Sequence, residues 1–389
     1  MDVRARLLEL IAPIAIGDEL APGARLARVS DDLGPRLTFA LADGAEVDVE
    51  VSPATAGLRH AARTAHLTLA YRGRAASAVG AALCAILAAR IGDRDAGFVA
   101  ALAAAGAADA PRVREVSVDH LLELAGPPGA RFYTCSPYVG CLIGCRFCYA
   151  QERLAAGRAA AGLPLAPWGS WVDVRANAAA VLADELARLP PHARHPIKFC
   201  PIVSDPYHAI EARLGLTRAC LAAIAAAAAP PPVLLLTRAA LVTRDLDLLA
   251  ALPWAGVGVS LPTIDDEVRA HFEPRAAPIA ARLATLAAIR AAGVAPIAVV
   301  QPMLPGPVDA LADALAAHVD SVSLDVLRGE GSAGPLFDDP RFAAARDEGW
   351  QQARLAALTA ALADRGVAVW TGELPPNLPP TLAPTLATH

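Results

Sequence analysis

The chain has 389 residues, of which 55% are hydrophobic and 19% charged, and its formal net charge is −5. This composition supports a large buried interior and excludes a chain that is disordered over most of its length. The acidic balance does not support nucleic-acid binding through overall charge, although a local stripe of arginine side chains could still provide it. Lys198 is the only lysine, and we interpret the bias toward arginine as the mark of a GC-rich genome.

No segment of the sequence has the features of a signal peptide or of a membrane-spanning helix. Three consecutive prolines at positions 230–232 interrupt the most apolar run, residues 219–236. The seven cysteines are an odd number, and four of them fall within residues 135–148. This distribution suits a metal site in a reducing compartment better than a disulfide framework, so we expect a cytoplasmic protein without a membrane partner.

Residues 1–125 predict a small α+β domain. The expected helices are residues 2–12, 75–91 and 94–107, and the expected strands are 25–29, 36–40, 45–51 and 66–71. No cluster of histidines, cysteines or carboxylates stands out in this part of the sequence. We expect it to dock a substrate or a partner protein.

Residues 126–330 alternate between short apolar runs and helical segments, which predicts a parallel sheet with crossover helices. The expected strands are 131–136, 197–203, 233–237, 256–261, 296–302 and 321–327, with helices at 149–160, 176–189, 212–228, 243–251, 279–292 and 307–318. Six such units indicate an α/β fold, a partial (β/α)6 TIM-type barrel, with reactive groups at the carboxyl ends of its strands. Residues 331–389 predict a helix over 341–364, a strand over 367–370 and a frayed proline-rich tail.

Cys141, Cys145 and Cys148 stand at C-x3-C-x2-C spacing in a glycine-containing loop after the first of these strands. Three thiolates can hold three irons of a [4Fe–4S] cluster and leave the fourth iron open for a ligand. Two other interpretations fit the spacing equally well. Cys135 could complete a closed zinc site of a binding protein, or it could be the fourth ligand of an electron-carrying cluster.

The stretch over residues 138–150 resembles the cluster motif of radical S-adenosylmethionine (SAM) enzymes, and more narrowly that of the spore photoproduct lyase or SplB-like branch. The resemblance extends over about residues 131–330 and includes the segments 174–177, 204–207, 236–238, 259–260 and 272–274, followed by Arg282. It implies an enzyme that cleaves SAM reductively at a [4Fe–4S] cluster. The resulting 5′-deoxyadenosyl radical would abstract a hydrogen atom from a substrate.

The same resemblance implies a one-electron reductant of the flavodoxin or ferredoxin type as a partner. It leaves the substrate open among a peptide, a metabolite and a nucleic-acid base. Repair of a DNA photoproduct is the alternative activity, and the acidic net charge argues against it.

Four residues match polar SAM contacts of the lyase branch. Ser204 and Asp205 would receive the ammonium group of the methionine moiety, although a Ser-Asp-Pro sequence is also typical of a turn or helix start. Arg238 stands where the family has a lysine that contacts the cofactor carboxylate, and a guanidinium can grip a carboxylate with two hydrogen bonds. Ser260 matches a serine near the ribose or carboxylate.

Arg175 and Asn177 match a basic-x-Asn element of the family, although a solvated helix start would look the same. Cys200 is a candidate hydrogen-atom donor, because the lyase has such a cysteine two residues before its serine. Here Cys200 lies four residues before Ser204, and strand alternation would keep both on one face; a buried core cysteine is the alternative. Tyr207 is a candidate hydrogen relay, or else a packing residue.

Overall fold

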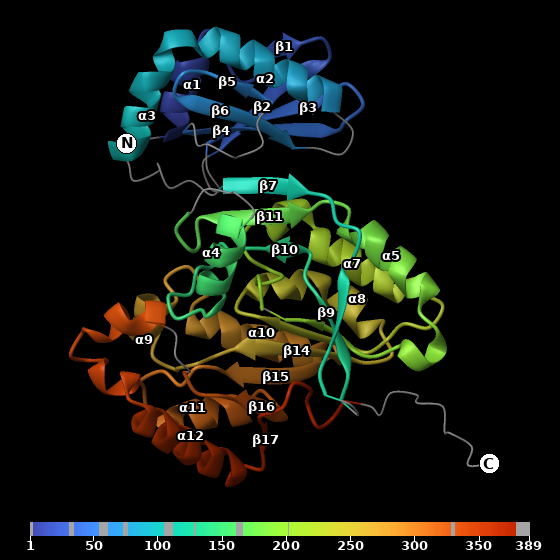
Figure 1. Ribbon diagram of the computed structural model, residues 1–389, viewed down its shortest axis with the longest axis vertical. Helices are drawn as coiled ribbons and strands as arrows, with labels where there is room; N and C mark the ends of the chain where they lie inside the picture. Colours follow the sequence, from blue (N-terminus) through green and yellow to red (C-terminus); the bar gives the residue numbers. More distant parts are fainter. Residues whose placement is uncertain are drawn as a thin grey trace. The chain divides into compact units, whose positions relative to one another are not determined.

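The computed structural model describes residues 3–30, 35–53, 61–72, 77–104, 112–127, 130–160, 166–200, 202–327 and 331–378. The chain divides into two compact units, which are residues 1–114 with 155–172, and residues 115–154 with 173–389 (Figure 1). In the described part of the chain, no helix has the length and apolar character that a membrane span requires.

The first unit is an antiparallel sheet with three helices, in agreement with the predicted α+β class. Its strand order is β1-β2-β3-β4-β6-β5. The elements are α1 (Val3–Ile11), β1 (Glu19–Ala21), β2 (Ala24–Ser30), β3 (Arg36–Leu41), β4 (Glu46–Pro53), β5 (Ala62–Arg63), β6 (Leu67–Arg72), α2 (Ser77–Ile91) and α3 (Asp95–Ala104). On β4, alternate side chains Val47, Val49 and Val51 are buried in the core of this unit, as a strand with one covered face requires.

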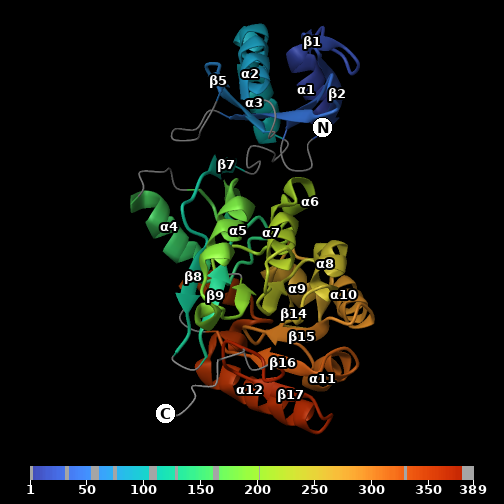
Figure 2. The same ribbon diagram turned by 90° about the vertical axis from the view of Figure 1, so that its right-hand side faces the viewer.

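The second unit is built on an eight-stranded sheet in the order β17-β16-β15-β14-β13-β12-β9-β8. In Figure 2 the strands β14, β15, β16 and β17 follow one another in this order. Its strands are β8 (Leu122–Ala125), β9 (Phe132–Cys135), β12 (Ile197–Phe199), β13 (Val233–Thr237), β14 (Ala255–Ser260), β15 (Ala295–Val300), β16 (Ser321–Leu324) and β17 (Ala368–Trp370). From β9 to β17 the strands are parallel and neighbours in chain order, whereas β8 pairs antiparallel with β9. The six predicted strands are therefore present.

Helices connect the parallel strands, as the alternating sequence pattern predicts. They are α5 (Ala178–Arg188), α6 (Glu211–Leu214), α7 (Leu216–Ala225), α8 (Leu246–Ala250), α9 (Asp266–Phe272), α10 (Ile279–Ala291), α11 (Val308–Ala316) and α12 (Glu348–Ala363). Four further elements are β7 (Arg112–Val116), β10 (Tyr138–Val139), α4 (Ala150–Ala160) and β11 (Trp171–Arg175), and short 3₁₀ helices cover Gly92–Arg94, Pro191–Ala193, Ala240–Asp245, Gly331–Phe337 and Ala343–Arg346. Among these elements, β7, β8, β10, β11 and α9 were not predicted from the sequence.

Side chains from several strands meet on one face of the second unit's sheet. Leu234 and Leu236 of β13 pack with Ile297 and Val299 of β15. Cys200, Trp254, Trp370 and Leu374, from the neighbourhoods of β12, β14 and β17, pack against this cluster. Strands that are not neighbours in the sheet thus share one small core.

The intervening strand β14 has glycines on this inner face. A Cβ atom on Gly258 would lie 2.4 Å from Leu236 Cδ2, and one on Gly256 would lie 2.6 Å from the Trp254 ring. Both contacts are far too short for real atoms. Glycine at these two positions therefore allows the leucine and the tryptophan to cover β14.

Several predicted boundaries were wrong, and three of them have a clear physical reason or a consequence for the site. The helix expected over residues 212–228 is two helices, because Gly215 between them has a left-handed backbone with φ of +61°. The helix expected from residue 341 begins at Glu348, where Asp347 caps it by accepting a hydrogen bond from Trp350 N. Strand β12 ends at Phe199 instead of residue 203, so strand alternation cannot place Cys200 and Ser204 on one face.

Candidate functional site

The second unit contains a cavity of about 640 Å³ at the carboxyl edge of its sheet. The residues around it are Cys145, Phe147, Cys148, Tyr149, Glu152, Lys198, Cys200, Ile202, Leu236, Arg238, Ser260, Val299, Gln301, Pro302, Ser323, Asp325, Val326, Leu327 and residues 370–373. Five residues predicted from the sequence as site residues therefore meet in one place. They are the predicted cluster ligands Cys145 and Cys148, the predicted SAM contacts Arg238 and Ser260, and the candidate hydrogen-atom donor Cys200.

The sheet explains why these residues meet. Ser260 is the last residue of β14, and Arg238, Gln301 and Asp325 each directly follow a strand. The carboxyl ends of neighbouring parallel strands lie at the same edge of a sheet, which is where α/β proteins hold ligands. Strand length and pairing thus bring residues that are far apart in sequence to one rim.

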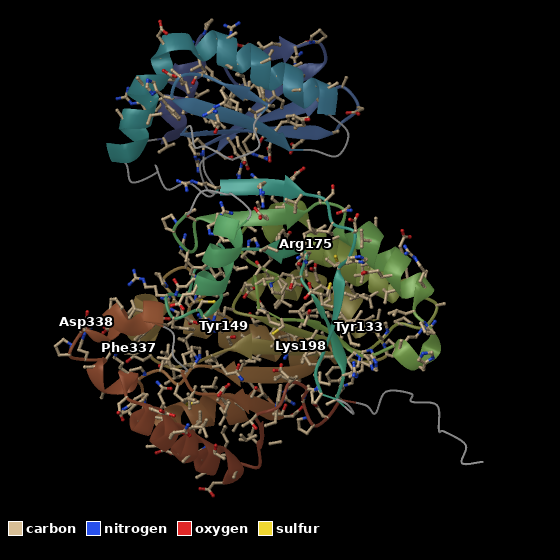
Figure 3. All side chains as sticks on the ribbon, in the orientation of Figure 1. Tyr133, Tyr149, Arg175, Lys198, Phe337 and Asp338 are labelled. Carbon is tan, nitrogen blue, oxygen red and sulfur yellow. The ribbon has the colours of Figure 1, made fainter. Side chains whose placement is uncertain are left out.

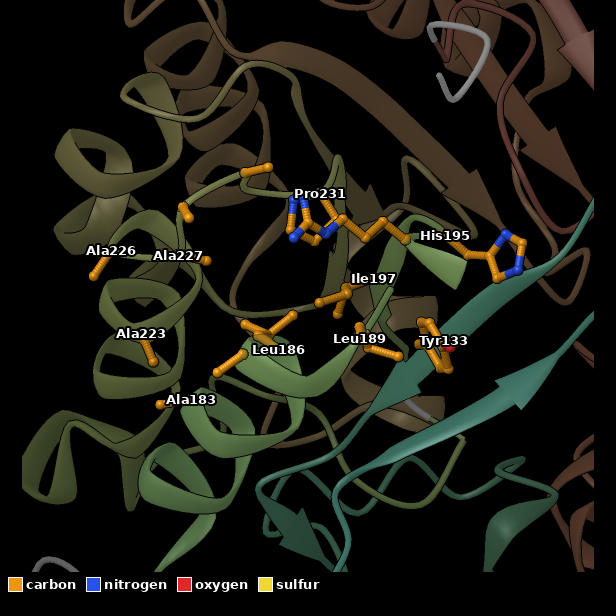
Figure 4. A pocket seen from close by; sticks show the side chains of 14 residues that line it. Tyr133, Ala183, Leu186, Leu189, His195, Ile197, Ala223, Ala226, Ala227 and Pro231 are labelled. Atoms are coloured by element: carbon orange, nitrogen blue, oxygen red, sulfur yellow. The ribbon is translucent and has the colours of Figure 1, made fainter. Parts of the chain in front are cut away.

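A second cavity, of about 380 Å³, lies at the opposite edge of the same sheet (Figure 4). Ile197, the first residue of β12, and Pro231, shortly before β13, line it together with Tyr133, His195 and alanines of α5 and α7. No cysteine lines it. It therefore does not share in the chemistry of the first cavity.

The cysteine loop runs from β10 to α4 and is tied down by its backbone. Gly140 N donates to Val203 O at 2.9 Å, and Arg146 N donates to Phe272 O at 2.9 Å. Gly140 and Gly144 have φ angles of +84° and +59°, a backbone conformation that favours glycine. The loop thus turns sharply on both sides of Cys141 and is held at both ends by neighbouring segments.

Burial dominates the chemistry of the loop thiols. It raises the pKa of Cys141 to about 12, against hydrogen bonds to the sulfur from the backbone N–H groups of Asp205 and Ile143. Burial also raises the pKa of Cys145 well above its usual value, and Arg238 opposes this effect. The charge states of Cys141 and Cys148 affect Cys145 as well, so the three sulfurs lie within electrostatic range of one another.

Arg238 belongs to a buried charged network beside Cys145. Its Nε donates to Glu273 Oε1 at 2.6 Å, and its Nη2 donates to Gln301 O at 3.2 Å. The second oxygen of Glu273 accepts from Arg282 Nη2 at 2.6 Å, and Arg282 Nη1 donates to Ser260 O at 2.8 Å. Glu273 and Arg282 are fully buried, so this network fixes Arg238 and the end of β14 together.

The charges in this network decide its protonation states. Burial by itself would raise the pKa of Glu273, but Arg282 and Arg238 more than offset this and hold it below its usual value. Burial by itself would lower the pKa of Arg238, but Cys145 and Glu273 outweigh it and leave the pKa raised. Arg238 is therefore a fixed cation at the rim of the cavity, and two of its three guanidinium nitrogens already have acceptors.

Ser204 and Asp205 have partners within the protein and do not line the cavity. Ser204 Oγ donates to Gly140 O at 2.6 Å, which ties the cysteine loop to the end of β12. Asp205 accepts hydrogen bonds from Tyr207 N, Thr237 Oγ1 and Arg238 N at 2.7–2.8 Å. Burial raises the pKa of Asp205 against these bonds. The geometry matches the turn alternative of the sequence analysis.

Three further predicted residues also lie outside the cavity lining. Arg175 Nη1 donates to Ser136 O at 2.9 Å. The Asn177 amide both accepts from Val118 N and donates to Val118 O, at 2.9 and 2.8 Å. The Tyr207 hydroxyl donates to Asp245 Oδ2 at 3.0 Å in a buried setting. Their observed contacts brace the protein, and the SAM-binding and hydrogen-relay roles stay predictions.

Cys135 does not join the loop cysteines. Its thiol hydrogen-bonds with Cys220, and its pKa is raised, chiefly by burial. Across the part of the chain that the structure describes, no three or more His, Cys, Asp or Glu side chains form a group suited to a single metal ion. A fourth sulfur from Cys135, which both alternatives to an open cluster require, therefore has no support in the geometry.

Four residues of the cavity were not predicted as site residues from the sequence: Lys198, Gln301, Trp370 and Glu373. Lys198 carried a usable signal, because a charged residue inside the short apolar strand β12 needs a partner or a function. Gln301 and Trp370 carried none, since each lies at the end of an ordinary strand pattern. Glu373 pairs with a residue 175 positions earlier, which no local pattern can reveal.

No protein-family model matches the chain. An uncharacterised protein of Mycobacterium tuberculosis is 34% identical over 179 residues, which are 44% of this chain and 50% of that protein. An uncharacterised protein of Methanocaldococcus jannaschii is 28% identical over 182 residues, which are 47% of this chain and 64% of that protein. The chain thus spans about half of the first relative and less than two thirds of the second.

Solved structures of spore photoproduct lyase, a radical SAM enzyme, are similar in fold. One variant aligns with a TM-score of 0.51 and 17% identity, over 70% of this chain and 85% of that chain. Another aligns with a TM-score of 0.50 and 16% identity, over 68% and 84%. A third, with bound AdoMet and dinucleoside spore photoproduct, has a TM-score of 0.48. At these identities the similarity shows a mixed α/β fold shared with that enzyme.

Proposed function

We propose that the protein is a radical SAM enzyme whose core is a partial (β/α)6 barrel. It would cleave SAM reductively at a [4Fe–4S] cluster held by Cys141, Cys145 and Cys148, and the 5′-deoxyadenosyl radical would abstract a hydrogen atom from a substrate. The observation that carries the proposal is the cavity, because it joins two of these cysteines to polar residues at the ends of successive strands.

The residues fit such a cluster. The loop offers three sulfurs within electrostatic range of one another, and Cys135 faces Cys220 instead of the loop. A cube binds each cysteine at a different iron, so its ligands need not converge on one point as those of a zinc ion do. When bound and reduced, the cluster supplies the electron that cleaves SAM to methionine and the 5′-deoxyadenosyl radical.

The protein's own residues would hold the cofactor and exclude water. Backbone N–H groups of Ile143 and Asp205 donate to the Cys141 sulfur, and such bonds tune a cluster's reduction potential. Arg238, fixed by Glu273, presents a cation to a carboxylate at the cavity rim. Ser260 and Cys200 line the same space, so we assign them to cofactor contact and to hydrogen-atom return.

Anaerobic reconstitution with iron and sulfide tests the proposal. We expect a cluster whose EPR signal changes when SAM is added, and 5′-deoxyadenosine after reduction by a flavodoxin- or ferredoxin-type donor. Cys145→Ala should lose both signals. Cys135→Ala is the matched control, because Cys135 is also buried and near the loop but should retain the cluster.

Three outcomes would contradict this function. Colourless protein with one bound zinc would support the zinc alternative. Loss of the cluster in Cys135→Ala would support an electron carrier with four cysteine ligands, and an EPR signal indifferent to SAM would also argue against the enzyme. Photoproduct repair stays a prediction, which adding the dinucleoside spore photoproduct to the same assay would test.

A further inference from the structure

Lys198 is the only lysine of the chain, and it lines the cavity. Figure 3 labels its position in the second unit. Its side chain is 5% exposed, and its Nζ lies 2.6 Å from Glu373 Oε2 and 5.2 Å from the centre of the Phe132 ring. Among the described residues, Glu373 is the one carboxylate paired with Lys198. The ammonium group therefore depends on a single counter-charge.

The two partners of this ion pair differ in exposure. The Glu373 side chain is 61% exposed, and it lies in the segment after β17, outside any helix or strand. The Glu373 side chain can therefore move into solvent, whereas Lys198 is held on β12 and its side chain is only 5% exposed. A buried charge that loses its partner is strongly destabilised. An entering anion can replace Glu373 beside Lys198, but an entering cation that captured Glu373 would leave Lys198 unpaired.

Trp370 provides an independent indication of a ligand. Its ring packs on the inner cluster with Cys200, and its indole Nε1 is buried without a hydrogen-bond partner among the described residues. An indole N–H can only donate, and buried donors of this kind usually have an acceptor. Trp370 lines the same cavity as Lys198, and a turn of its ring toward that cavity would let a bound anion supply the missing acceptor.

We propose that the Lys198–Glu373 pair is the substrate-recognition element of this cavity, and that it selects a substrate with an anionic oxygen group, a carboxylate or a phosphate. The anion displaces Glu373, pairs with Lys198 and accepts a hydrogen bond from Trp370. Calling the bound anion a substrate rests on the proposed function. The binding chemistry itself requires no cluster.

Thermal unfolding of the full-length protein tests the anion site. Inorganic phosphate and glutarate serve as anionic probes, and ethylammonium at the same ionic strength serves as the cationic probe. We expect phosphate or glutarate to raise the melting temperature, and the one that acts identifies the group recognised. Glu373→Gln removes the internal competitor, so its Kd for that anion should fall about five- to tenfold.

Two further variants make the result decisive. Lys198→Met should lose the response to anions, whereas Asp320→Asn, which breaks an exposed ion pair with Arg290, should keep the response of the unmodified protein. An ion pair with a merely structural role would not give tighter anion binding in Glu373→Gln. Equal anion responses in all variants, weaker binding in Glu373→Gln, or stabilisation by ethylammonium alone would overturn the proposal.

The test of the anion site and the test of the proposed function can fail independently of each other. If 5′-deoxyadenosine forms but no anion binds, the anion site is wrong and the enzyme assignment stands. If anions bind through Lys198 but the reconstituted protein never cleaves SAM, the anion site stands and the enzyme assignment fails. If Lys198→Met does not fold, the Kd of Glu373→Gln for the anion still tests the anion site, because a lower Kd supports it and a higher Kd contradicts it.

Discussion

Replacing Glu273 by glutamine should destabilise the second unit by about 3–5 kcal/mol. Both carboxylate oxygens of Glu273 lie 2.6 Å from guanidinium nitrogens, one of Arg238 and one of Arg282. The side chains of Glu273 and Arg282 are 0% exposed, and that of Arg238 is 13% exposed. Glu273→Gln keeps the shape of the side chain but leaves two cations facing each other across a buried, uncharged amide.

Urea unfolding, followed by circular dichroism and tryptophan fluorescence, measures this loss. The matched control is Asp320→Asn, because Asp320 also pairs with an arginine, Arg290, at 3.0 Å, but with side chains 61% and 47% exposed. An exposed pair of this kind contributes less than about 1 kcal/mol. The double variant Glu273→Gln/Arg282→Met should recover part of the loss, since it removes one unpaired charge. Equal losses for Glu273→Gln and the control would refute the reasoning that burial determines the cost.

Two other substitutions test the interior of the second unit. Burial lowers the pKa of His208 to about 3 and neither ring nitrogen has a partner among the described residues. The unfolded chain therefore binds a proton below pH 6.5 that the folded protein refuses, so stability should fall by about 2 kcal/mol from pH 7.5 to 5.0. His208→Phe should remove this part of the pH dependence of urea unfolding, and an unchanged slope would contradict it. Gly258→Ala should cost about 1–3 kcal/mol, because its Cβ would lie 2.4 Å from Leu236 Cδ2; an unchanged urea midpoint would show that β14 can shift.

The sequence predicts the parallel strands of the second unit because most of them are short apolar runs. Strands such as β13 (Val233–Thr237) are fully buried, and a strand covered on both faces reads as continuous hydrophobicity. The short strands β10 and β11 escape prediction, since Tyr138 and Val139 pair with residues over thirty positions away. Their pairing depends on tertiary contact and not on a local pattern.

In the candidate site, too, some features follow from a local sequence pattern and others depend on tertiary contacts. Cys141, Cys145 and Cys148 are recognisable because a local loop holds them, and Arg238 and Ser260 because they end strands. Position alone does not predict the hydrogen-bond partners of the other residues. Ser204 and Asp205 also follow a strand, but their side chains are used to hold Gly140, Thr237 and Arg238 in place. Position at a strand end brings a residue to the rim, and hydrogen-bond partners decide whether it faces the cavity.

Cys200 is the residue on which the two proposals converge. Burial raises the pKa of its thiol, and the charges of Lys198, Glu373 and Arg238 all act on it. Cys200 therefore lies within electrostatic range both of Arg238, which we propose contacts the cofactor, and of the Lys198–Glu373 pair, which we propose recognises the substrate. Hydrogen-atom donation requires the S–H bond and not the thiolate, so the buried setting favours the form that the predicted role needs. A substrate anchored at Lys198, two residues before Cys200 in the chain, would bring its radical into the part of the cavity where this thiol lies.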